Sequence, residues 1–229
     1  MDRTALVLAP HPDDAELGMA GTLCALAEHY KTVIVDLSDG EPTPFGTKET
    51  RAQETEQATQ ILGIHSRVQL DIACREIFDT VENRKEIAGV IRKFRPEILF
   101  VPYWEDAHPD HVQASQLCDA SRFYAKLVKS DLPYEPYYPR RVFYFFSTHL
   151  RLRIAPSFVV DISAHIERKR RALEAYQSQF VKNPANRGFV ERVITENAYW
   201  GQQCHVDFGE PFVCRESLVV RTAETLFEI

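Results

Sequence analysis

The stretch TALVLAPHPDDAELG, residues 4–18, decides the fold. Its first six residues are an apolar run of strand length, and residues 16–30 carry apolar side chains at helical spacing. Between the two runs lies a turn that contains one histidine and two carboxylates, His11, Asp13 and Asp14. A buried strand that leads through a turn into an amphipathic helix is the beginning of a βαβ unit, and such units build parallel sheets.

The same alternation of strand and helix continues along the chain. Further strands are predicted at 32–37, 68–70, 97–102, 142–146, 158–162 and 217–221, and further helices at 50–62, 80–94, 110–128, 164–180 and 189–203. This order predicts an α/β, Rossmann-like fold in which three layers, αβα, surround a mostly parallel central sheet. Because no repeat or linker interrupts the pattern, residues 1–229 are predicted to form a single domain.

The composition excludes several classes of protein. The chain has 27 Lys plus Arg against 33 Asp plus Glu, a net charge of −6, and 45% apolar residues. No apolar run approaches the ~20 residues of a membrane span, and no long basic cluster indicates nucleic acid. We therefore expect a cytoplasmic protein without a membrane or nucleic-acid partner. The five cysteines form no C-x-x-C pair, which argues against a thiolate zinc site. The nine glycines form no phosphate-binding loop motif, which argues against a nucleotide-binding site of that type.

A second cluster of histidine and carboxylate follows the predicted strand at 97–102. It is the motif HPDH, in which Asp110 stands between His108 and His111. In a doubly wound sheet, ligands bind beyond the carboxyl ends of the strands. Such a sheet would bring this cluster next to the one that follows the first strand.

Together the two clusters contain more ligands than one metal ion needs. A catalytic zinc site takes three ligands from His, Asp or Glu and leaves a position open. The surplus carboxylate and histidine are then available as a general base and as an acid or electrophile for hydrolysis. Each cluster alone also fits a structural role, because Asp14 can cap a helix and His-Pro can form a rigid turn. The pair at matching positions favours a metal site.

The motifs APHPDDAELG, residues 9–18, and HPDH resemble those of the zinc-dependent N-acetylglucosaminyl deacetylases of the PIG-L/LmbE type. The stretches PYWEDAHPDH, DISAHIERKRRALEAYQSQF and GEPF are similar to the branch of that family that serves bacillithiol biosynthesis. The resemblance implies an LmbE-like deacetylase fold over the whole chain and removal of the acetyl group from N-acetylglucosaminyl malate. It also implies Zn²⁺, with Fe²⁺ or another divalent metal as alternatives, and a homo-oligomer such as a hexamer.

The resemblance further implies a role for each residue of the first cluster. His11 and Asp14, with His111 from the second cluster, would bind the metal. Asp13 would be the general base that takes a proton from the metal-bound water.

Other roles implied by the resemblance concern the substrate. His108 would protonate the leaving amine or stabilise the oxyanion, and Asp110 would orient the His108 imidazole. Arg51, Arg75 and Glu210 are the predicted substrate-binding residues. For Glu210 a structural salt bridge is an equally good interpretation.

Two departures from the family's pattern leave the substrate open. Ala73 and Cys74 stand where many relatives have a Pro-Asp pair, whose Asp is expected to contact the sugar. Phe208 stands where close relatives have a Tyr, whose hydroxyl can assist the oxyanion. Another N-acetylglucosamine compound, or the amide of a thiol conjugate, would use the same machinery.

Two hypotheses from other functional classes fit part of the pattern. Two histidines and a carboxylate also form the facial triad of mononuclear iron(II) oxygenases, and a non-catalytic sugar- or metal-binding module would keep such ligands without turnover. The surplus Asp13 and His108 favour the hydrolase over both. Surface or capping roles are expected for four other histidines, which lack a partner at ligand spacing: His29, His65, His149 and His165.

Overall fold

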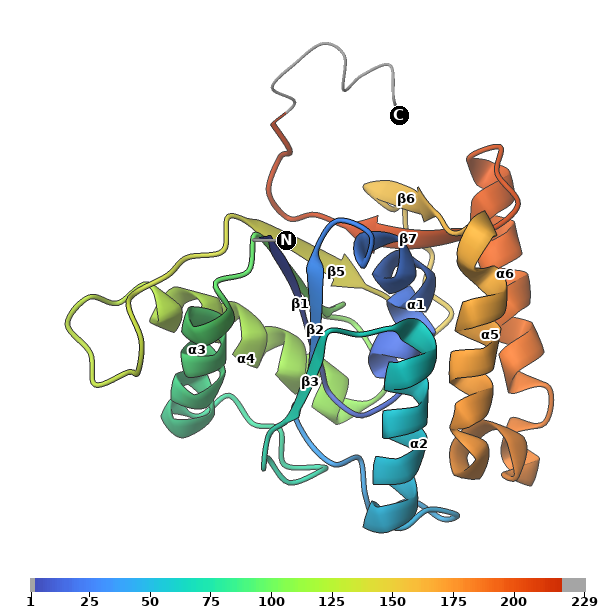
Figure 1. The fold of residues 1–229 in the computed structure, drawn as a ribbon, viewed down its shortest axis with the longest axis horizontal. Coiled ribbons are helices and arrows are strands. Elements are labelled where there is room, and N and C mark those ends of the chain that lie inside the picture. The colour runs from blue at the N-terminus through green and yellow to red at the C-terminus, as the bar shows by residue number, and fades with distance from the viewer. Residues whose placement is uncertain (1–2, 220–229) are drawn as a thin grey trace.

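Strand β1 lies inside a seven-stranded sheet, next to the central strand β4, and the sheet has helices on both faces (Figure 1). The computed structural model describes residues 3–219. The strands are β1 (Thr4–Ala9), β2 (Lys31–Asp36), β3 (Ser66–Gln69), β4 (Ile98–Pro102), β5 (Arg141–Phe145), β6 (Phe158–Asp161) and β7 (Gly209–Val213). The α-helices are α1 (Asp14–Leu26), α2 (Lys48–Leu62), α3 (Val81–Phe94), α4 (Pro109–Ala125), α5 (Ile166–Ala175) and α6 (Phe189–Gln203).

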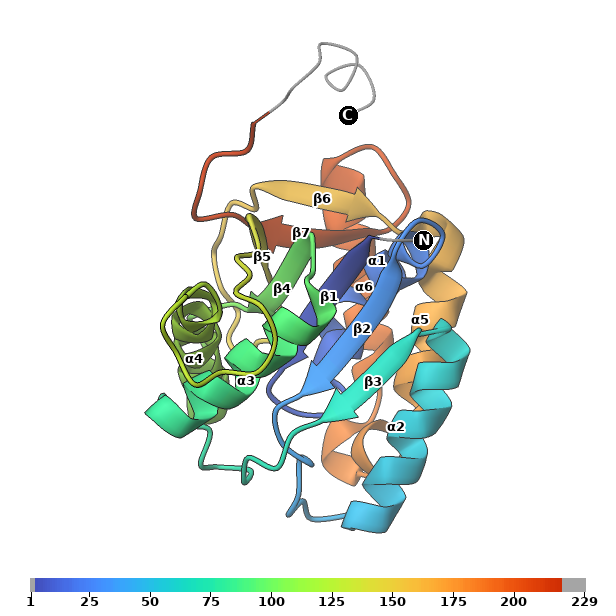
Figure 2. The same cartoon turned by 60° about the vertical axis from the view of Figure 1, so that its left-hand side comes forward.

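The sheet has the strand order β3-β2-β1-β4-β5-β7-β6 (Figure 2). Strands β1 to β5 pair in parallel, whereas β7, which lies between β5 and β6, is antiparallel to both of them. The predicted α/β fold with a mostly parallel sheet is therefore confirmed. The strand order reverses between β1 and β4, which are paired directly. The loops that follow these two strands consequently leave the sheet side by side, at its topological switch point.

The two faces of the sheet bury separate cores. Helices α1, α2, α5 and α6 cover one face and α3 and α4 the other (Figures 1 and 2). Along β1, Ala5 and Val7 belong to the first core, whereas Leu6 and Leu8 belong to the second. Because both faces are covered, the strand is apolar at every position from Ala5 to Ala9 instead of alternating. None of the described helices is long and apolar enough to cross a membrane.

Two predicted elements near the C-terminus differ from the structure. The helix predicted at 164–180 ends at Ala175 and gives way to a π-helical turn, Gln177–Val181. The strand predicted at 217–221 is irregular at 217–219, and residues 220–221 lie outside the described residues. The last strand within residues 3–219 is instead β7, whose sequence GEPFV contains a buried Glu and a Pro and so lacks the apolar run of a central strand.

Helix α1 is broken at Met19, and a buried ion pair satisfies the backbone groups that the break releases. The carboxylate of Glu210 accepts a hydrogen bond from Gly21 N at 3.0 Å. Lys169 Nζ donates to Leu17 O at 2.8 Å and to Glu210 Oε1 at 2.7 Å. Both charged side chains are fully buried, so the pair ties α5 and β7 to the helix that follows the first motif.

Replacing Lys169 by Met should destabilise the fold strongly. The substitution leaves the Glu210 carboxylate buried without a counter-charge, so the free energy of unfolding should fall by about 3–5 kcal/mol in urea denaturation. Arg170→Gln is the matched control, because Arg170 lies on the same helix as Lys169 but forms a partly exposed ion pair, with Glu191 of α6. Its loss should cost at most about 1 kcal/mol. Equal losses for the two variants would contradict this role of the buried pair.

Candidate active site

The first motif forms a strained turn between β1 and α1. Asp13 has a φ of 109°, in the left-handed region that few residues other than glycine adopt. Asp14 Oδ2 accepts a hydrogen bond from His11 N at 3.0 Å, which closes the turn. Backbone strain of this kind costs about 1–3 kcal/mol and is found mainly at functional sites. Here it presents two successive carboxylates on the same side of the turn, next to the loop that follows β4.

Three side chains of the two motifs have the geometry of a metal site. Nδ1 of His11 and Nε2 of His111 each lie 3.3 Å from Asp14 Oδ2. Ligands about 2.1 Å from a tetrahedral ion are roughly 3.4 Å apart, so these donor atoms fit one divalent cation. All three side chains are buried. The structure thus brings together the three predicted metal ligands.

The outer nitrogen of each imidazole contacts a further carboxylate. His11 Nε2 lies 3.0 Å from Asp110 Oδ2, and His111 Nδ1 lies 2.7 Å from Asp106 Oδ2. Histidines that bind metals usually donate their second N–H to a carboxylate in this way, which fixes the ring and its tautomer. The contacts leave His11 Nδ1 and His111 Nε2 as the atoms that face a metal.

In the structure the Asp110 carboxylate, which was predicted to orient His108, contacts other groups. That carboxylate contacts His11 and accepts a hydrogen bond from Arg75 N at 2.6 Å. It is the backbone N–H of Asp110 that donates to His108 Nδ1, at 3.2 Å, because His108 is the N-cap of α4. Since Nδ1 accepts, a neutral His108 carries its proton on Nε2 and has a donor available for a ligand.

Asp106 links the loop that follows β4 to the loop that follows β5, beside the candidate metal ligands. This residue was not identified from the sequence. Besides His111, it accepts hydrogen bonds from His108 N at 3.1 Å and from His149 N at 3.0 Å. The surface or capping role expected of His149 is therefore incomplete. Its ring is more than half exposed, yet it lines the same cavity as His108 and lies 3.4 Å from Asp106 Oδ1. Nothing in the sequence relates these residues, because His149 follows β5 and Asp106 follows β4.

Replacing Asp106 by Asn should weaken metal binding. Loss of such an outer carboxylate typically lowers metal affinity about 10- to 100-fold, because the ligating imidazole is less basic and less well oriented. Competition with a chromophoric chelator measures the affinity directly. Glu105→Gln, which alters an exposed carboxylate one residue away, should bind metal as the unchanged protein does. An unchanged affinity in Asp106→Asn would contradict the assigned role.

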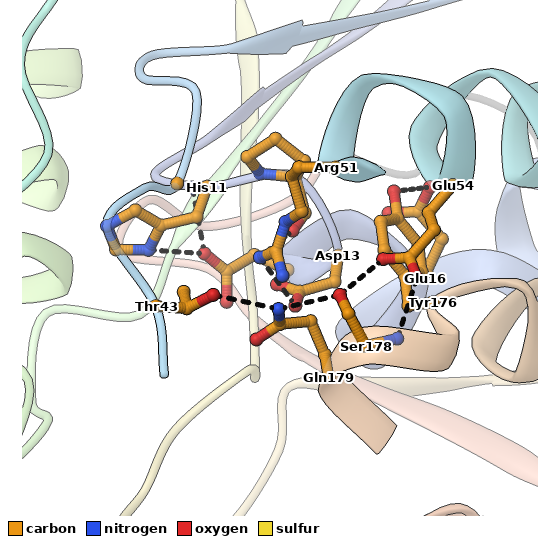
Figure 3. Close-up of polar contacts among 12 residues, drawn as sticks. His11, Asp13, Glu16, Thr43, Arg51, Glu54, Tyr176, Ser178 and Gln179 are labelled. Carbon is orange, nitrogen blue, oxygen red and sulfur yellow. Dashed lines mark hydrogen bonds and ion pairs between the residues drawn. The ribbon is translucent and has the colours of Figure 1, made fainter. Parts of the chain in front are cut away.

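Asp13 is paired with Arg51 of α2 at the edge of the metal cluster (Figure 3). Arg51 Nη2 donates to Asp13 Oδ2 at 2.9 Å and to Pro12 O at 2.6 Å. Burial raises the pKa of Asp13 to about 7, although the charge of Arg51 opposes the rise. Arg51 Nε and Nη1 are buried and have no hydrogen-bond partner among the described residues. Asp13 is therefore a carboxylate that exchanges a proton near neutral pH.

The charges around the candidate metal ligands favour positive charge next to Asp14 and disfavour it at His108. Burial opposes ionisation of Asp14, but the imidazoles of His111 and His11 hold its pKa well below the ordinary value. Burial lowers the pKa of His111, yet Asp14 and Asp106 raise it to about 9. The pKa of His108 is lowered to about 4 by burial and by the neighbouring imidazoles of His111, His11 and His149. A cation at the ligands next to a neutral His108 is the arrangement that this charge pattern stabilises.

A cavity of about 480 Å³ opens onto the cluster, a size within the usual range for small-molecule sites. Of the predicted substrate-binding residues, Arg51 and Arg75 line it, as does Cys74. Phe208 does not line it and packs against the first core instead. Glu210 does not line it either, and its carboxylate is engaged with Lys169 and α1. The structure favours the structural interpretation of Glu210.

The chain is similar to several known proteins. The model of the PIG-L family, described as GlcNAc-PI de-N-acetylase, matches residues 6–121, which include both motifs. Diacetylchitobiose deacetylase of Thermococcus kodakarensis is 34% identical over 194 residues, 78% of this chain and 70% of that protein. A probable N-acetyl-alpha-D-glucosaminyl L-malate deacetylase 2 of Bacillus anthracis is 28% identical over 218 residues, 87% and 92% of the two chains. The crystal structure of a conserved protein from Thermus thermophilus, TT1542, has a TM-score of 0.88 and 39% identity, covering 96% of this chain and 99% of that one.

Proposed function

Because the chain belongs to the PIG-L family, we propose that it is a metal-dependent deacetylase that hydrolyses the acetamide of an N-acetylglucosamine conjugate. The observation that carries the proposal is the set of groups around one cavity. Three buried side chains, His11, Asp14 and His111, fit a divalent cation, and Asp13 and His108 line the same cavity outside this proposed ligand set. A protein that only bound sugar or metal would not need these two groups.

Zn²⁺ is the proposed metal, because two imidazoles and one carboxylate in a site with an open position are typical of catalytic zinc. A zinc ion held there by His11, Asp14 and His111 would polarise the acetyl carbonyl and lower the pKa of a bound water towards ~7. The same three ligands also suit Fe²⁺. Metal analysis of the purified protein, followed by reconstitution with each ion, distinguishes the two.

The residues of the chain divide the proton transfers between them. Asp13 accepts a proton from the attacking water, and its pKa of about 7 suits a general base at neutral pH. Arg51 holds the Asp13 carboxylate in place. His108 Nε2, on a neutral ring, donates a hydrogen bond to the developing oxyanion, and the proton that Asp13 has accepted from the water passes to the leaving amine. The C–N bond of the acetamide breaks, and acetate and a free amino sugar are released.

N-acetylglucosaminyl malate is the substrate that we propose first. The Bacillus anthracis relative, whose name contains that compound, matches over 92% of its own length. The cavity is also lined by three arginines whose guanidinium groups form no ion pair within residues 3–219: Arg75, Arg151 and Arg192. Guanidinium groups recognise carboxylates, and the malate moiety has two. N,N′-diacetylchitobiose and the amide of a thiol conjugate are the alternatives.

Acetate release from a panel of substrates tests the proposal. The panel comprises N-acetylglucosaminyl malate, N,N′-diacetylchitobiose and free N-acetylglucosamine, each with the zinc-loaded protein. We expect the malate conjugate to give the highest kcat/KM. Sugar binding without acetate release from any compound would instead support a binding module, and oxygen consumption in the presence of a reductant would support an oxygenase.

Replacing Arg51 by Met should shift the pH dependence of turnover. Asp13 acts as a base only when it is deprotonated, so activity falls as the pH drops through its pKa. The charge of Arg51 lowers that pKa, and its removal should therefore move the acid limb of the kcat profile to higher pH. The measurement uses saturating zinc and substrate, with Arg51→Lys as the control that keeps the charge. If Arg51→Met changed KM alone, Arg51 would bind substrate without acting on Asp13.

A further inference from the structure

The amide of Gln179 has its orientation set by the groups around it. Gln179 lies in the π-helical turn between α5 and α6 and lines the cavity together with Thr43 and Arg51. Its Nε2 donates to Thr43 Oγ1 at 3.1 Å and to Ser178 Oγ at 3.0 Å, as Figure 3 shows. The amide nitrogen is thus bound between two hydroxyl groups from different segments of the chain.

Both hydroxyl groups have already committed their only proton. Thr43 Oγ1 donates to Glu41 Oε1, and Ser178 Oγ donates to Glu54 Oε2, each at 2.7 Å. A hydroxyl group has one proton and two lone pairs, so a hydroxyl that donates to a carboxylate can only accept from the amide. A reversed amide would place its oxygen against two oxygens that have no proton to share. Glu41 and Glu54 therefore direct Nε2 of Gln179 towards the hydroxyls.

The two carboxylates are themselves fixed. Glu41 Oε2 accepts from Thr43 N and Glu54 Oε1 accepts from Ser178 N, each at 2.6 Å. Both carboxylate side chains are buried. Gly46 allows its own backbone to pass close to the Glu41 carboxylate, because a Cβ at position 46 would lie only 2.4 Å from Glu41 Oε1. The orientation of the amide is thus imposed by a rigid network before any ligand arrives.

The oxygen of the same amide is left available. No described residue donates a hydrogen bond to Gln179 Oε1. Unlike Arg51 Nε, this atom is not among the buried side-chain atoms that lack a hydrogen-bond partner, so it is accessible. We propose that Gln179 Oε1 is a specificity determinant that accepts a hydrogen bond from a hydroxyl or N–H group of the substrate. This inference rests on the proposed function, since it takes that substrate to be an N-acetylglucosamine conjugate, whose ring carries several hydroxyl donors. A fixed acceptor selects against ligands that lack the donor.

Kinetics of Gln179→Met with deoxygenated substrates tests the inference. Methionine has a similar length but cannot form the hydrogen bond, so KM should rise about 3- to 10-fold while kcat changes little. The substrate set is the N-acetylglucosamine conjugate on which the unchanged protein is most active and its 3-, 4- and 6-deoxy analogues. The unchanged protein should discriminate against one analogue, and Gln179→Met should lose that discrimination.

Gln177→Met is the matched control, because Gln177 lies in the same π-helical turn but does not line the cavity. It should keep both KM and the discrimination. Equal KM values for the two variants, or the same discrimination among deoxy analogues in Gln179→Met as in the unchanged protein, would overturn the inference. A purely structural role of Gln179 would lower the melting temperature without changing which analogue is discriminated.

Equilibrium binding separates this inference from the proposed function. Calorimetric binding of N-acetylglucosamine to the zinc-loaded protein needs no turnover. If no substrate released acetate, the proposed function would fail, yet weaker binding by Gln179→Met than by Gln177→Met would still support the role of Gln179. Equal binding by both variants would overturn that role, whatever the turnover.

Discussion

Replacing Asp13 by Asn is expected to lower kcat about 10²- to 10⁴-fold while the protein keeps its metal. Asp13 lines the cavity beside the proposed metal ligands without being one of them, and burial raises its pKa to about 7. An amide cannot accept the proton of the attacking water. Asparagine is the replacement of choice, because it tolerates the left-handed backbone conformation that position 13 requires.

The experiment measures acetate release and bound metal in the same preparation of Asp13→Asn. We expect about one metal ion per chain and almost no turnover. Asp131→Asn, which alters an exposed carboxylate paired with Lys85, is the control and should keep full activity. Normal turnover in Asp13→Asn would show that another group is the base, and loss of the metal would show that Asp13 is a ligand.

Replacing His111 by Ala should abolish both metal binding and activity. His111 is one of the three proposed ligands and, with His11, offsets the buried charge of Asp14. The loss of metal affinity should exceed the roughly 10- to 100-fold expected when only an outer carboxylate is removed. Chelator-treated unchanged protein should likewise be inactive and regain activity with zinc, whereas His111→Ala should not recover at stoichiometric zinc. Restoration of the variant by stoichiometric zinc would contradict the assigned ligand set.

The sequence predicted the parts of the fold that depend on local pattern. The apolar runs of β1 and β4 and the helices between them follow from periodicity, and the parallel sheet follows from their alternation. Strand β7 could not be predicted in this way. Its Pro211 and buried Glu210 break the apolar pattern, and the strand is stabilised by pairing with β5 and β6 and by the contact of Glu210 with Lys169.

The part of the candidate site that depends on local sequence motifs was also predictable. The residues of HPDD and HPDH are local motifs at strand ends, so their meeting follows from the topology of the sheet. The partners of these residues were not predictable, because they depend on three-dimensional placement. The Asp110 carboxylate contacts His11, and it is the backbone N–H of Asp110 that contacts His108. Asp106 contacts His149, which lies in a different loop. Likewise, the orientation of Gln179 depends on hydroxyl groups from two separate segments.

Titration of zinc into chelator-treated protein, with acetate release from an N-acetylglucosamine conjugate as the readout, tests the central claim most directly. Deacetylation should rise with zinc until about one ion per chain is bound, and the same titration of Asp13→Asn should fill the site without turnover. Full deacetylation by the metal-free protein, or turnover by Asp13→Asn equal to that of the unchanged protein, would contradict the account.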